Sequence, residues 1–581
     1  MKKLTFIFIC LIPLIATAQI QVIENPDYRI RNTGLETISK IELHDTITKM
    51  HIHISFLPGW WVEYYPTDFL KPGNSDEKYF LLGVENEELN KQLSTPSGEA
   101  DYVLLFPPLD KSIKEVHYGD IKNGQEVIAI HNISLENSFD KVRYHKSREI
   151  PDSIKKRLEE EIKKTLDKET VDFDSDSFFG NDPARLVGFI QGYTSETIKT
   201  ITIYSRSLSG EILPLPLKLY PDGYFDADIY IEHPKMLSFR LLKSGEASFY
   251  IEPGHTLAMI LDWEDVLKGD RYRDRQYIFT NTEFAGSLAE VNRDLLKRNI
   301  FKPSWYDIEN RMKNMSPTEL LKDIEDRINN NLETIRKTEA EHPIHPKAKR
   351  LIENEIKAEA LTELLDFDMN YLRREFEKGE PPISNDYYDP LKLLTDDRSL
   401  LAVLTADRLI SSLNSASIFY RPGNLYRPEF KPNESFGEYL AANGKVVSEE
   451  LTKYLPIIQE TLEAPEGKVS EETKKALREN NEAIQQLLLE HINEFMDYQN
   501  KYTKKDPFEN YTINLQKRND ILKDSLGING ILKDVSLLYN HFIWQNTFND
   551  ITADDVNSMS EGIMELLTNP YIKRVFSEHK F

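Results

Sequence analysis

Cysteine is nearly absent from this chain of 581 residues, whose only cysteine is Cys10. It lies within an apolar N-terminal segment, and Phe8 and Ile9 before it are unlike the small residues that precede a lipid-bearing cysteine. We therefore expect no lipid attachment at Cys10. Removal of the segment would leave a chain without cysteine, which excludes disulfide bonds, Cys-x-x-Cys redox chemistry and cysteine nucleophiles in the mature protein.

The signatures of several catalytic classes are also missing. The chain has no G-x-S-x-G motif, no S-x-x-K motif in a suitable context, and too few glycines, 24 in all, to supply glycine-rich phosphate loops readily. Asp366 and Asp368 are two positions apart in a predicted helix and cannot face each other as a glycosidase pair. The sequence therefore gives no catalytic, cofactor-binding or metal-binding residue, and it predicts a protein that is not an enzyme and needs no cofactor.

Basic residues are outnumbered by acidic ones, and the formal net charge is −24. Because a surface of this charge repels polyphosphate backbones, we expect no nucleic-acid partner. Apolar residues make up 40% of the chain, which is enough for several packed cores in a chain too long for one. The sequence leaves the oligomeric state and the ligand open.

The N-terminus has the three parts of a signal peptide. Lys2 and Lys3 are basic, Leu4 to Ile15 form an apolar run too short to span a bilayer comfortably, and Ala16-Thr17-Ala18 is an A-x-A cleavage site. We expect residues 1–18 to be removed near Ala18. The protein would then be exported to the periplasm, the cell envelope or the exterior, with no membrane span, since no later apolar run approaches that length.

Two segments have the pattern of β domains, so the sequence predicts a multidomain α+β protein. In residues 19–145, Met50, Ile52 and Ile54 alternate with His51 and His53, as expected of an N-terminal antiparallel β-sandwich. Residues 185–265 contain short apolar and β-branched runs separated by turn residues. They predict a second, small antiparallel β domain.

The rest of the chain has helical periodicity. Residues 146–184 predict a helical linker with a narrow apolar stripe from Ile154 to Leu166. Residues 266–581 predict an all-α helical domain, in which Ser316 and Glu319 form a capping box. The first predicted helix begins at this capping box, and the second carries apolar residues from Leu351 to Phe376. The later predicted helices are Ser399–Asn414, Ser448–Leu462, Glu471–Lys501, Asn514–Leu526, Ile531–Phe548 and one after Thr552.

The strand IEPGHTLAMILDW is followed by a helix start with Phe284, Gly286, Ala289 and Asn292 and then by a long helical segment. This order resembles the N-terminal accessory region of TlpA-like thiol–disulfide oxidoreductases of Bacteroides-type bacteria. In that family the helices lead into a thioredoxin domain with a W-C-x-x-C motif, which this chain lacks. The resemblance implies either a relative without a redox domain or a shortened reading frame.

Two groups of side chains suggest metal sites, and neither completes one. Asp172, Asp174 and Asp176 begin like a calcium loop, but Ser177 and Pro183 stand where glycine and a bidentate glutamate are needed. We expect a solvated acidic linker there.

The second group is histidine. His51 and His53 share a strand face, but nothing in the sequence brings His117 or His131 to them, and zinc needs more ligands than two. His342-Pro-Ile-His345 lacks the helical H-E-x-x-H geometry, and we expect a loop there.

Aromatic clusters give the remaining candidates for binding. In Trp60-Trp61, strand alternation predicts one side chain in the core and one exposed, and Tyr64-Tyr65 follow them. Exposed aromatics there could stack on sugars. Tyr387-Tyr388 and the loop from Phe419 to Pro428, FYRPGNLYRP, suit either a helix crossing or a contact surface.

Three functional hypotheses follow from these observations. The leading one is an exported, non-catalytic binding or assembly protein of unknown ligand, with a protein partner at the cell envelope. The first alternative is the accessory part of a TlpA-like thiol–disulfide reductase whose redox domain is missing from this chain. The second alternative is a glycan-binding protein.

Overall fold

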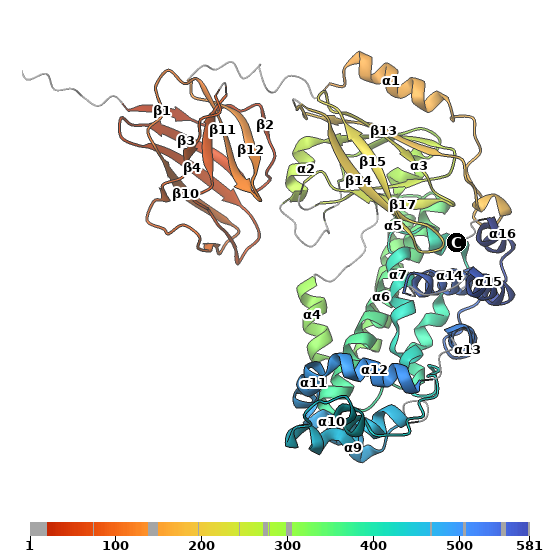
Figure 1. Ribbon diagram of the computed structural model, residues 1–581. Coiled ribbons are helices and arrows are strands. Elements are labelled where there is room, and N and C mark those ends of the chain that lie inside the picture. The colour runs from red at the N-terminus through yellow and green to blue at the C-terminus, as the bar shows by residue number, and fades with distance from the viewer. Residues whose placement is uncertain are drawn as a thin grey trace, which may run out of the picture.

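The structure is a computed structural model. It describes residues 20–73, 75–136, 149–195, 197–242, 245–270, 277, 279–297, 305–394, 396–464, 468–503, 507–547 and 553–578. Residues 1–18, the predicted signal peptide, lie outside the described residues. Figure 1 shows an N-terminal β region, a central β region and a helical region that extends away from the strands. The predicted multidomain α+β class is confirmed.

Two five-stranded antiparallel sheets form the N-terminal region. The first contains, in spatial order, β1 (Gln21–Glu24), β3 (Glu36–Leu43), β4 (Thr48–Ser55), β10 (Glu99–Phe106) and β8 (Gly83–Val84). The second contains β2 (Ile30–Arg31), β12 (Gln125–Ser134), β11 (Glu115–Lys122), β6 (Phe69–Pro72) and β7 (Tyr79–Phe80). A short pair, β5 (Trp60–Val62) with β9 (Leu93–Thr95), adds a third, two-stranded sheet.

Strand alternation explains how the two sheets pack. On β4 the side chains of Met50, Ile52 and Ile54 are fully buried, whereas His51 and His53 lie on the opposite, partly exposed face. Inward-facing residues of both sheets form one apolar core that is separate from the rest of the protein. The predicted N-terminal antiparallel sandwich is therefore confirmed.

The central region is a six-stranded sheet. Its spatial order is β14 (Lys199–Arg206), β15 (Ile212–Leu219), β16 (Tyr224–Ile229), β13 (Ala184–Gln191), β19 (Thr256–Asp262) and β20 (Glu283–Ala285). A hairpin of β17 (Lys235–Phe239) and β18 (Ala247–Ile251) interrupts the path from β16 to β19.

Pairing in the central sheet is antiparallel, as predicted, except at one pair of strands. β13 and β19 are parallel, with Arg185 opposite Thr256 and Gln191 opposite Asp262. The other pairs of this sheet are antiparallel. The segment from β14 to β18 forms the long connection between β13 and β19 that parallel neighbours require. Strand composition does not reveal such a crossover.

The central region continues past residue 265, the predicted limit of the second β domain. β20 pairs with β19, and α2 (Trp263–Asp270) and α3 (Ala289–Leu295) contribute buried residues to the same core. α2 also contacts the sandwich, because Trp263 Nε1 donates to the Arg31 carbonyl at 2.9 Å. The linker helix α1 (Asp152–Lys163) packs Ile154 and Leu158 on the other face of the sheet. It ends before Leu166, which is exposed.

Helices dominate the chain after residue 305. They are α4 (Trp305–Asn314), α5 (Pro317–Glu341), α6 (Pro346–Lys378), α7 (Ala406–Ser415), α8 (Phe436–Ala442), α9 (Glu449–Glu463), α10 (Glu471–Glu479), α11 (Asn481–Glu490), α12 (Ile492–Tyr502), α13 (Pro507–Asp520), α14 (Gly530–Thr547), α15 (Ala553–Leu566) and α16 (Pro570–Glu578). Short helices with 3₁₀ geometry are η1 (Asp176–Phe178), η2 (Asn385–Leu393), η3 (Arg398–Ala402) and η4 (Ser417–Tyr420). A short π-helix, η6 (Ile521–Ser525), follows α13.

Two predicted helices are broken in the structure. The segment Glu471–Lys501 forms α10, α11 and α12, with breaks at Asn480 and His491. The Asn480 amide donates back to the Ala476 carbonyl, a local bond that competes with helix continuation. The segment Ser399–Asn414 forms η3 and then α7. In both cases the apolar pattern continues across the break, so periodicity alone does not reveal it.

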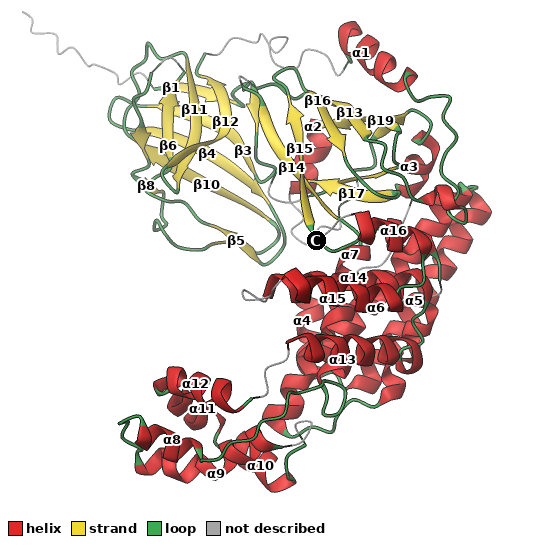
Figure 2. Ribbon diagram, turned by 45° about the vertical axis from the view of Figure 1, so that its right-hand side comes forward, coloured by secondary structure: helices red, strands yellow, loops and turns green. Residues whose placement is uncertain are grey.

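The helical region contains two apolar cores. One, formed by α8 to α12, lies at the end distant from the strands (Figure 2). The other helices share a single core with the central sheet, because α3, α5, α6, α7, α13 and α14 pack residues into the same cluster as β13 to β19. Within the described residues, no helix is both long and apolar enough to cross a membrane.

Asp68 in the sandwich gives a test of this packing. Burial raises the pKa of its carboxyl from 3.8 to about 7, against a hydrogen bond from the Tyr65 backbone. Because the folded state binds the proton more tightly, stability is lost as pH rises from about 4 to 7. We expect Asp68→Asn to match the wild type near pH 4 and to be more stable at pH 8 by up to roughly 4 kcal/mol.

Differential scanning calorimetry of the full chain across this pH range measures the effect. Asp76→Asn is the control, because it removes the same charge from a fully exposed side chain. Equal stability of Asp68→Asn and wild type at pH 8 would contradict the raised pKa of the Asp68 carboxyl.

Candidate functional site

The histidines considered as metal ligands fall into separate places. His51 contacts Glu42 at 3.2 Å, and His53 contacts Glu99 and Asp101, both at 2.9 Å. His117 and His131 do meet, on β11 and β12 of the other sheet, with ring centroids 5.4 Å apart. Among the residues that the structure describes, no three His, Cys, Asp or Glu side chains gather in a way that could hold a metal ion.

The other loop with histidines caps a helix. His345 is the N-cap of α6, and its ring accepts a hydrogen bond from the Lys347 backbone at 3.2 Å. Its own backbone N–H donates to Asp294 at 2.6 Å. Both contacts are structural.

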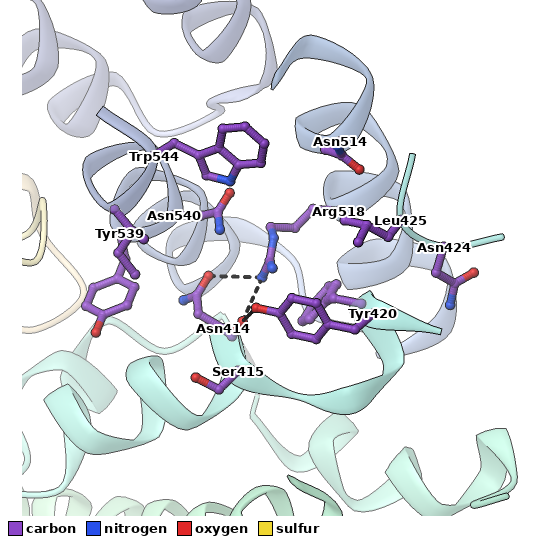
Figure 3. A pocket seen from close by; sticks show the side chains of 12 residues that line it. Asn414, Ser415, Tyr420, Asn424, Leu425, Asn514, Arg518, Tyr539, Asn540 and Trp544 are labelled. Atoms are coloured by element: carbon purple, nitrogen blue, oxygen red, sulfur yellow. Dashed lines mark hydrogen bonds between the residues drawn. The ribbon is translucent and has the colours of Figure 1, made fainter. Parts of the chain in front are cut away.

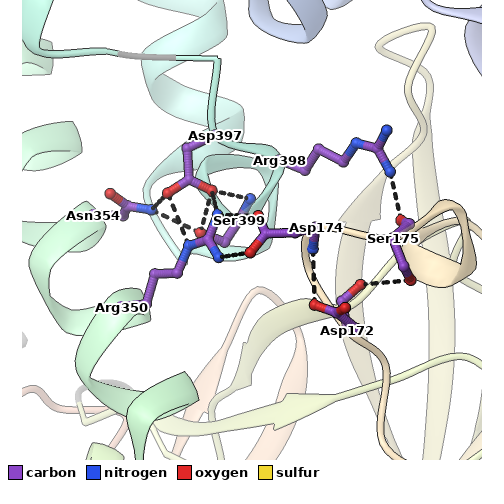
Figure 4. A network of polar contacts seen from close by, with 8 residues as sticks. All are labelled: Asp172, Asp174, Ser175, Arg350, Asn354, Asp397, Arg398 and Ser399. Atoms are coloured by element: carbon purple, nitrogen blue, oxygen red, sulfur yellow. Dashed lines mark hydrogen bonds and ion pairs between the residues drawn. The ribbon is translucent and has the colours of Figure 1, made fainter.

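The acidic segment from Asp172 to Asp176 is not simply solvated, which corrects the expected role. It docks the linker onto the helical region (Figure 4). Asp174 accepts two hydrogen bonds from Arg350 of α6, at 2.7 and 2.8 Å. Arg398 of η3 donates to the Ser175 carbonyl.

Arg350 also holds the buried end of this network. It donates to both carboxylate oxygens of Asp397, at 3.1 and 2.7 Å. Burial alone would raise the pKa of Asp397, but hydrogen bonds from Arg350, Asn354 and Ser399 outweigh it and hold the pKa at about 2. The network therefore joins the linker, α6 and η3 into one unit.

The aromatic pairs also differ from the expectation. Trp60 and Trp61 are both 41% exposed, because β5 is only three residues long and pairs with β9 outside the two large sheets. Tyr387 and Tyr388 are instead buried in the helical core, where they donate to the Leu364 carbonyl and to Asp368. Tyr387 and Tyr388 therefore offer no contact surface.

A cavity of about 160 Å³ lies in the helical region between α7, η4, α13 and α14 (Figure 3). Its lining includes Tyr420, Asn424 and Leu425 of the loop FYRPGNLYRP. Among the described residues that line it, Arg518 of α13 is the only charged side chain.

Arg518 is buried without a counter-ion. It is 7% exposed, and it takes part in no ion pair with a described residue. Its Nη1 donates to the backbone and side-chain oxygens of Asn414, at 3.3 and 3.1 Å. The guanidinium carbon lies 3.9 Å from the centre of the Phe419 ring, which compensates part of the charge. The Tyr420 hydroxyl also interacts with the guanidinium, whereas no hydrogen bond joins Nε or Nη2 to a described residue.

Burial lowers the pKa of Arg518 to about 10, although the nearby Tyr420 hydroxyl acts in the opposite direction. The side chain therefore remains a cation at neutral pH. Transfer of a charge from water into a protein interior without a partner costs several kcal/mol. The fold thus maintains a destabilising positive charge at the wall of a cavity.

Four asparagines line the cavity, and they differ in their hydrogen bonds. The side chain of Asn414 is held firmly, since it also donates to the Ile410 carbonyl and accepts from Ser536. Asn514 is held by the backbone of Tyr426. Asn424 donates to the Ile418 carbonyl at 2.7 Å, and its Oδ1 accepts from no described residue.

Asn540 of α14 is the exception. It is 8% exposed, yet its amide makes no hydrogen bond with a described residue. Figure 3 shows its side chain directed into the cavity beside Arg518. The amide therefore presents one donor group and one acceptor to whatever occupies the cavity.

Tyr539 connects the cavity with the central sheet. Its ring lies under Arg206 at 5.4 Å, and its hydroxyl donates to Ser411 of α7 at 3.1 Å. Gly210, in the turn between β14 and β15, has φ +96°, and a Cβ there would lie 2.4 Å from the Tyr539 ring. Glycine is therefore required for the close approach of this turn to the cavity wall.

Sequence reasoning singled out the loop at Tyr420 but missed Arg518 and Asn540. A signal for Arg518 exists in α13 and η6, where Tyr511, Leu515, Arg518 and Leu522 follow one another at intervals of four, three and four and are all buried. An arginine in an otherwise apolar stripe is a charge that the fold buries. Asn540 carries no comparable signal, because asparagine also occurs at many surface positions of these helices.

The docking network leads to a comparison of two variants. Arg350→Met would leave Asp397, whose side chain is 16% exposed, without its cation. We expect the free energy of unfolding of Arg350→Met to fall by roughly 2–3 kcal/mol. Asp174→Asn leaves the Arg350–Asp397 pair intact and removes an exposed partner, so we expect less than about 1 kcal/mol. Chemical denaturation of both variants measures this difference. Equal losses in the free energy of unfolding would show that the buried Arg350–Asp397 pair stabilises the fold no more than the exposed Arg350–Asp174 pair.

Comparison with protein-family models, with curated proteins and with solved structures found no match for this chain. The resemblance to TlpA-like accessory regions is therefore not tested by these comparisons and stays a prediction.

Proposed function

We propose that this chain is a non-catalytic, exported binding protein whose helical region binds a small carboxylate at Arg518. One observation carries the proposal: a buried guanidinium without an ion pair borders a cavity that also contains the unpartnered amide of Asn540. The leading sequence hypothesis, a binding protein of unknown ligand, thereby gains a site and a ligand class.

The energetic argument supports binding. The buried Arg518 destabilises the empty protein, and an anion that enters the cavity would remove that cost while it gains a charge-assisted hydrogen bond. A guanidinium offers donors in a planar fork, and a carboxylate accepts from such a fork through two parallel hydrogen bonds. Since Nη1 is occupied by Asn414, the Nε and Nη2 edge is available for this contact.

The lining also limits the charge of the ligand. A single cation matches a single negative charge, whereas the second charge of a phosphate dianion would stay unpaired in a mostly uncharged cavity. Of the lining residues, none offers a carboxylate or an imidazole as a general base. This composition favours binding over a proton-transfer reaction at this site.

The place of action is part of the same proposal. The basic Lys2 and Lys3, the apolar run from Leu4 to Ile15 and the A-x-A site that ends at Ala18 support export. An exported, cysteine-free protein meets ligands and protein partners at the cell envelope.

Asn540→Asp tests the proposal. The new carboxylate would supply the counter-ion that Arg518 lacks, at nearly constant volume. We expect the free energy of unfolding at pH 7 to rise by roughly 1–3 kcal/mol and the affinity for carboxylates to fall at least about tenfold. Thermal unfolding and isothermal titration calorimetry with acetate, benzoate and inorganic phosphate measure both effects.

Asn330→Asp is the matched control, because it adds the same charge on the exposed face of α5. The control should bind like the wild type, and benzoate should bind the wild type better than phosphate does. Absence of carboxylate binding to the wild type, or equal binding to Asn540→Asp, would overturn the proposal.

A further inference from the structure

The cavity has features that a simple carboxylate does not use. Beside Arg518 it presents the amide of Asn540, apolar side chains of Leu425 and Ile543, and the Trp544 ring. We propose that the carboxylate bound here is the C-terminus of a peptide whose last residue is apolar. This inference rests on the proposed function and names its ligand class.

The Asn540 amide fits a peptide better than it fits an inorganic anion. A carboxamide has an N–H donor and a C=O acceptor side by side in one plane. In an extended peptide the N–H and C=O of one residue point to the same side, so the backbone of the penultimate residue can exchange two hydrogen bonds with the carboxamide. A bare carboxylate could use only the donor. An amide left unpaired in a buried site costs about 1–3 kcal/mol, and the backbone of the residue before the terminal one removes this cost.

The charge of the lining excludes a free amino acid. A buried α-ammonium group is a second positive charge beside Arg518, and no acidic side chain lines the cavity to neutralise it. In a peptide the corresponding nitrogen is a neutral amide. The ligand then carries one charge at its end, which matches the single cation Arg518.

The walls and the rim suit a chain that enters by its end. The apolar and aromatic lining provides a place for an apolar last side chain. Tyr420 is 45% exposed and Ile543 is 43% exposed, so the cavity opens to solvent between α14 and η4. The rest of a peptide can leave through this opening.

The site is held in place before binding. Asn514 accepts from the Tyr426 backbone at 2.7 Å, and Lys517 donates to the Gly423 carbonyl at 2.6 Å. These bonds fix the loop that carries Asn424 to α13, the helix that carries Arg518. Because the loop is already ordered, binding loses little of its free energy to ordering the protein.

Fluorescence polarisation with the full chain tests the inference. The probes are tetrapeptides that carry a dye at the N-terminus and end in leucine, either as the free acid or as the C-terminal amide. We expect the acid to bind and the amide to bind at least about tenfold more weakly, because it lacks the charge that pairs with Arg518. A peptide acid that ends in glutamate should also bind more weakly than the leucine acid, since its side chain would bury a second charge.

Two variants separate peptide recognition from general damage. Asn540→Ala should reduce the affinity for the peptide acid more than the affinity for benzoate, because only the peptide uses both groups of the amide. Arg518→Met should abolish binding of both, with circular dichroism and thermal unfolding as checks of the fold. If Arg518→Met does not fold, Asn540→Asp serves as the variant that neutralises the charge of the site.

The outcomes distinguish this inference from the proposed function. If benzoate binds and the peptide acid binds no better than its amide, the peptide inference fails and the carboxylate site stands. If neither benzoate nor the peptide acid binds, both fail. Equal binding of the leucine and glutamate peptides would contradict only the claim that the last residue is apolar.

Discussion

A buried ion pair between the central sheet and the longest helix anchors the architecture. Glu252, which follows β18 and is fully buried, accepts from Lys347 of α6 at 2.6 Å, from the Tyr250 hydroxyl and from the Val171 backbone. Since α6 runs for 33 residues away from this point, the pair sets where the helical region leaves the sheet. A single apolar core shared by the sheet and the helices then holds α5, α7, α13 and α14 in place beside α6. The Arg350 network adds the linker to the same junction.

The half-buried Lys347 and the buried Arg518 have opposite roles in this account. Lys347 is neutralised by Glu252, and the pair stabilises one arrangement of the domains. Arg518 has only neutral partners, so its charge stays available at the cavity. Proteins usually pair or expose such charges. The contrast within one core is why we assign a structural role to the first cation and a binding role to the second.

Much of the fold could be predicted from the sequence, but the site could not. Alternation on β4 and the capping box at Ser316 depend on local pattern, and both appear as expected. The parallel pairing of β13 with β19 depends on a connection that runs through β14 to β18, which no local pattern encodes. The cavity joins Tyr420, Arg518 and Asn540, which are far apart in sequence. Only the packing of η4, α13 and α14 brings them together.

The most direct test of the central claim is the side-chain NMR signal of Arg518. In protein labelled with ¹⁵N-arginine, the Nε–H resonance that disappears in Arg518→Lys identifies the residue. The account predicts that this resonance shifts in a saturable way when a carboxylate is added and stays in place when the same concentration of chloride is added. A resonance that does not respond to carboxylates, or that responds equally to chloride, would show that Arg518 is a structural cation and would contradict the account.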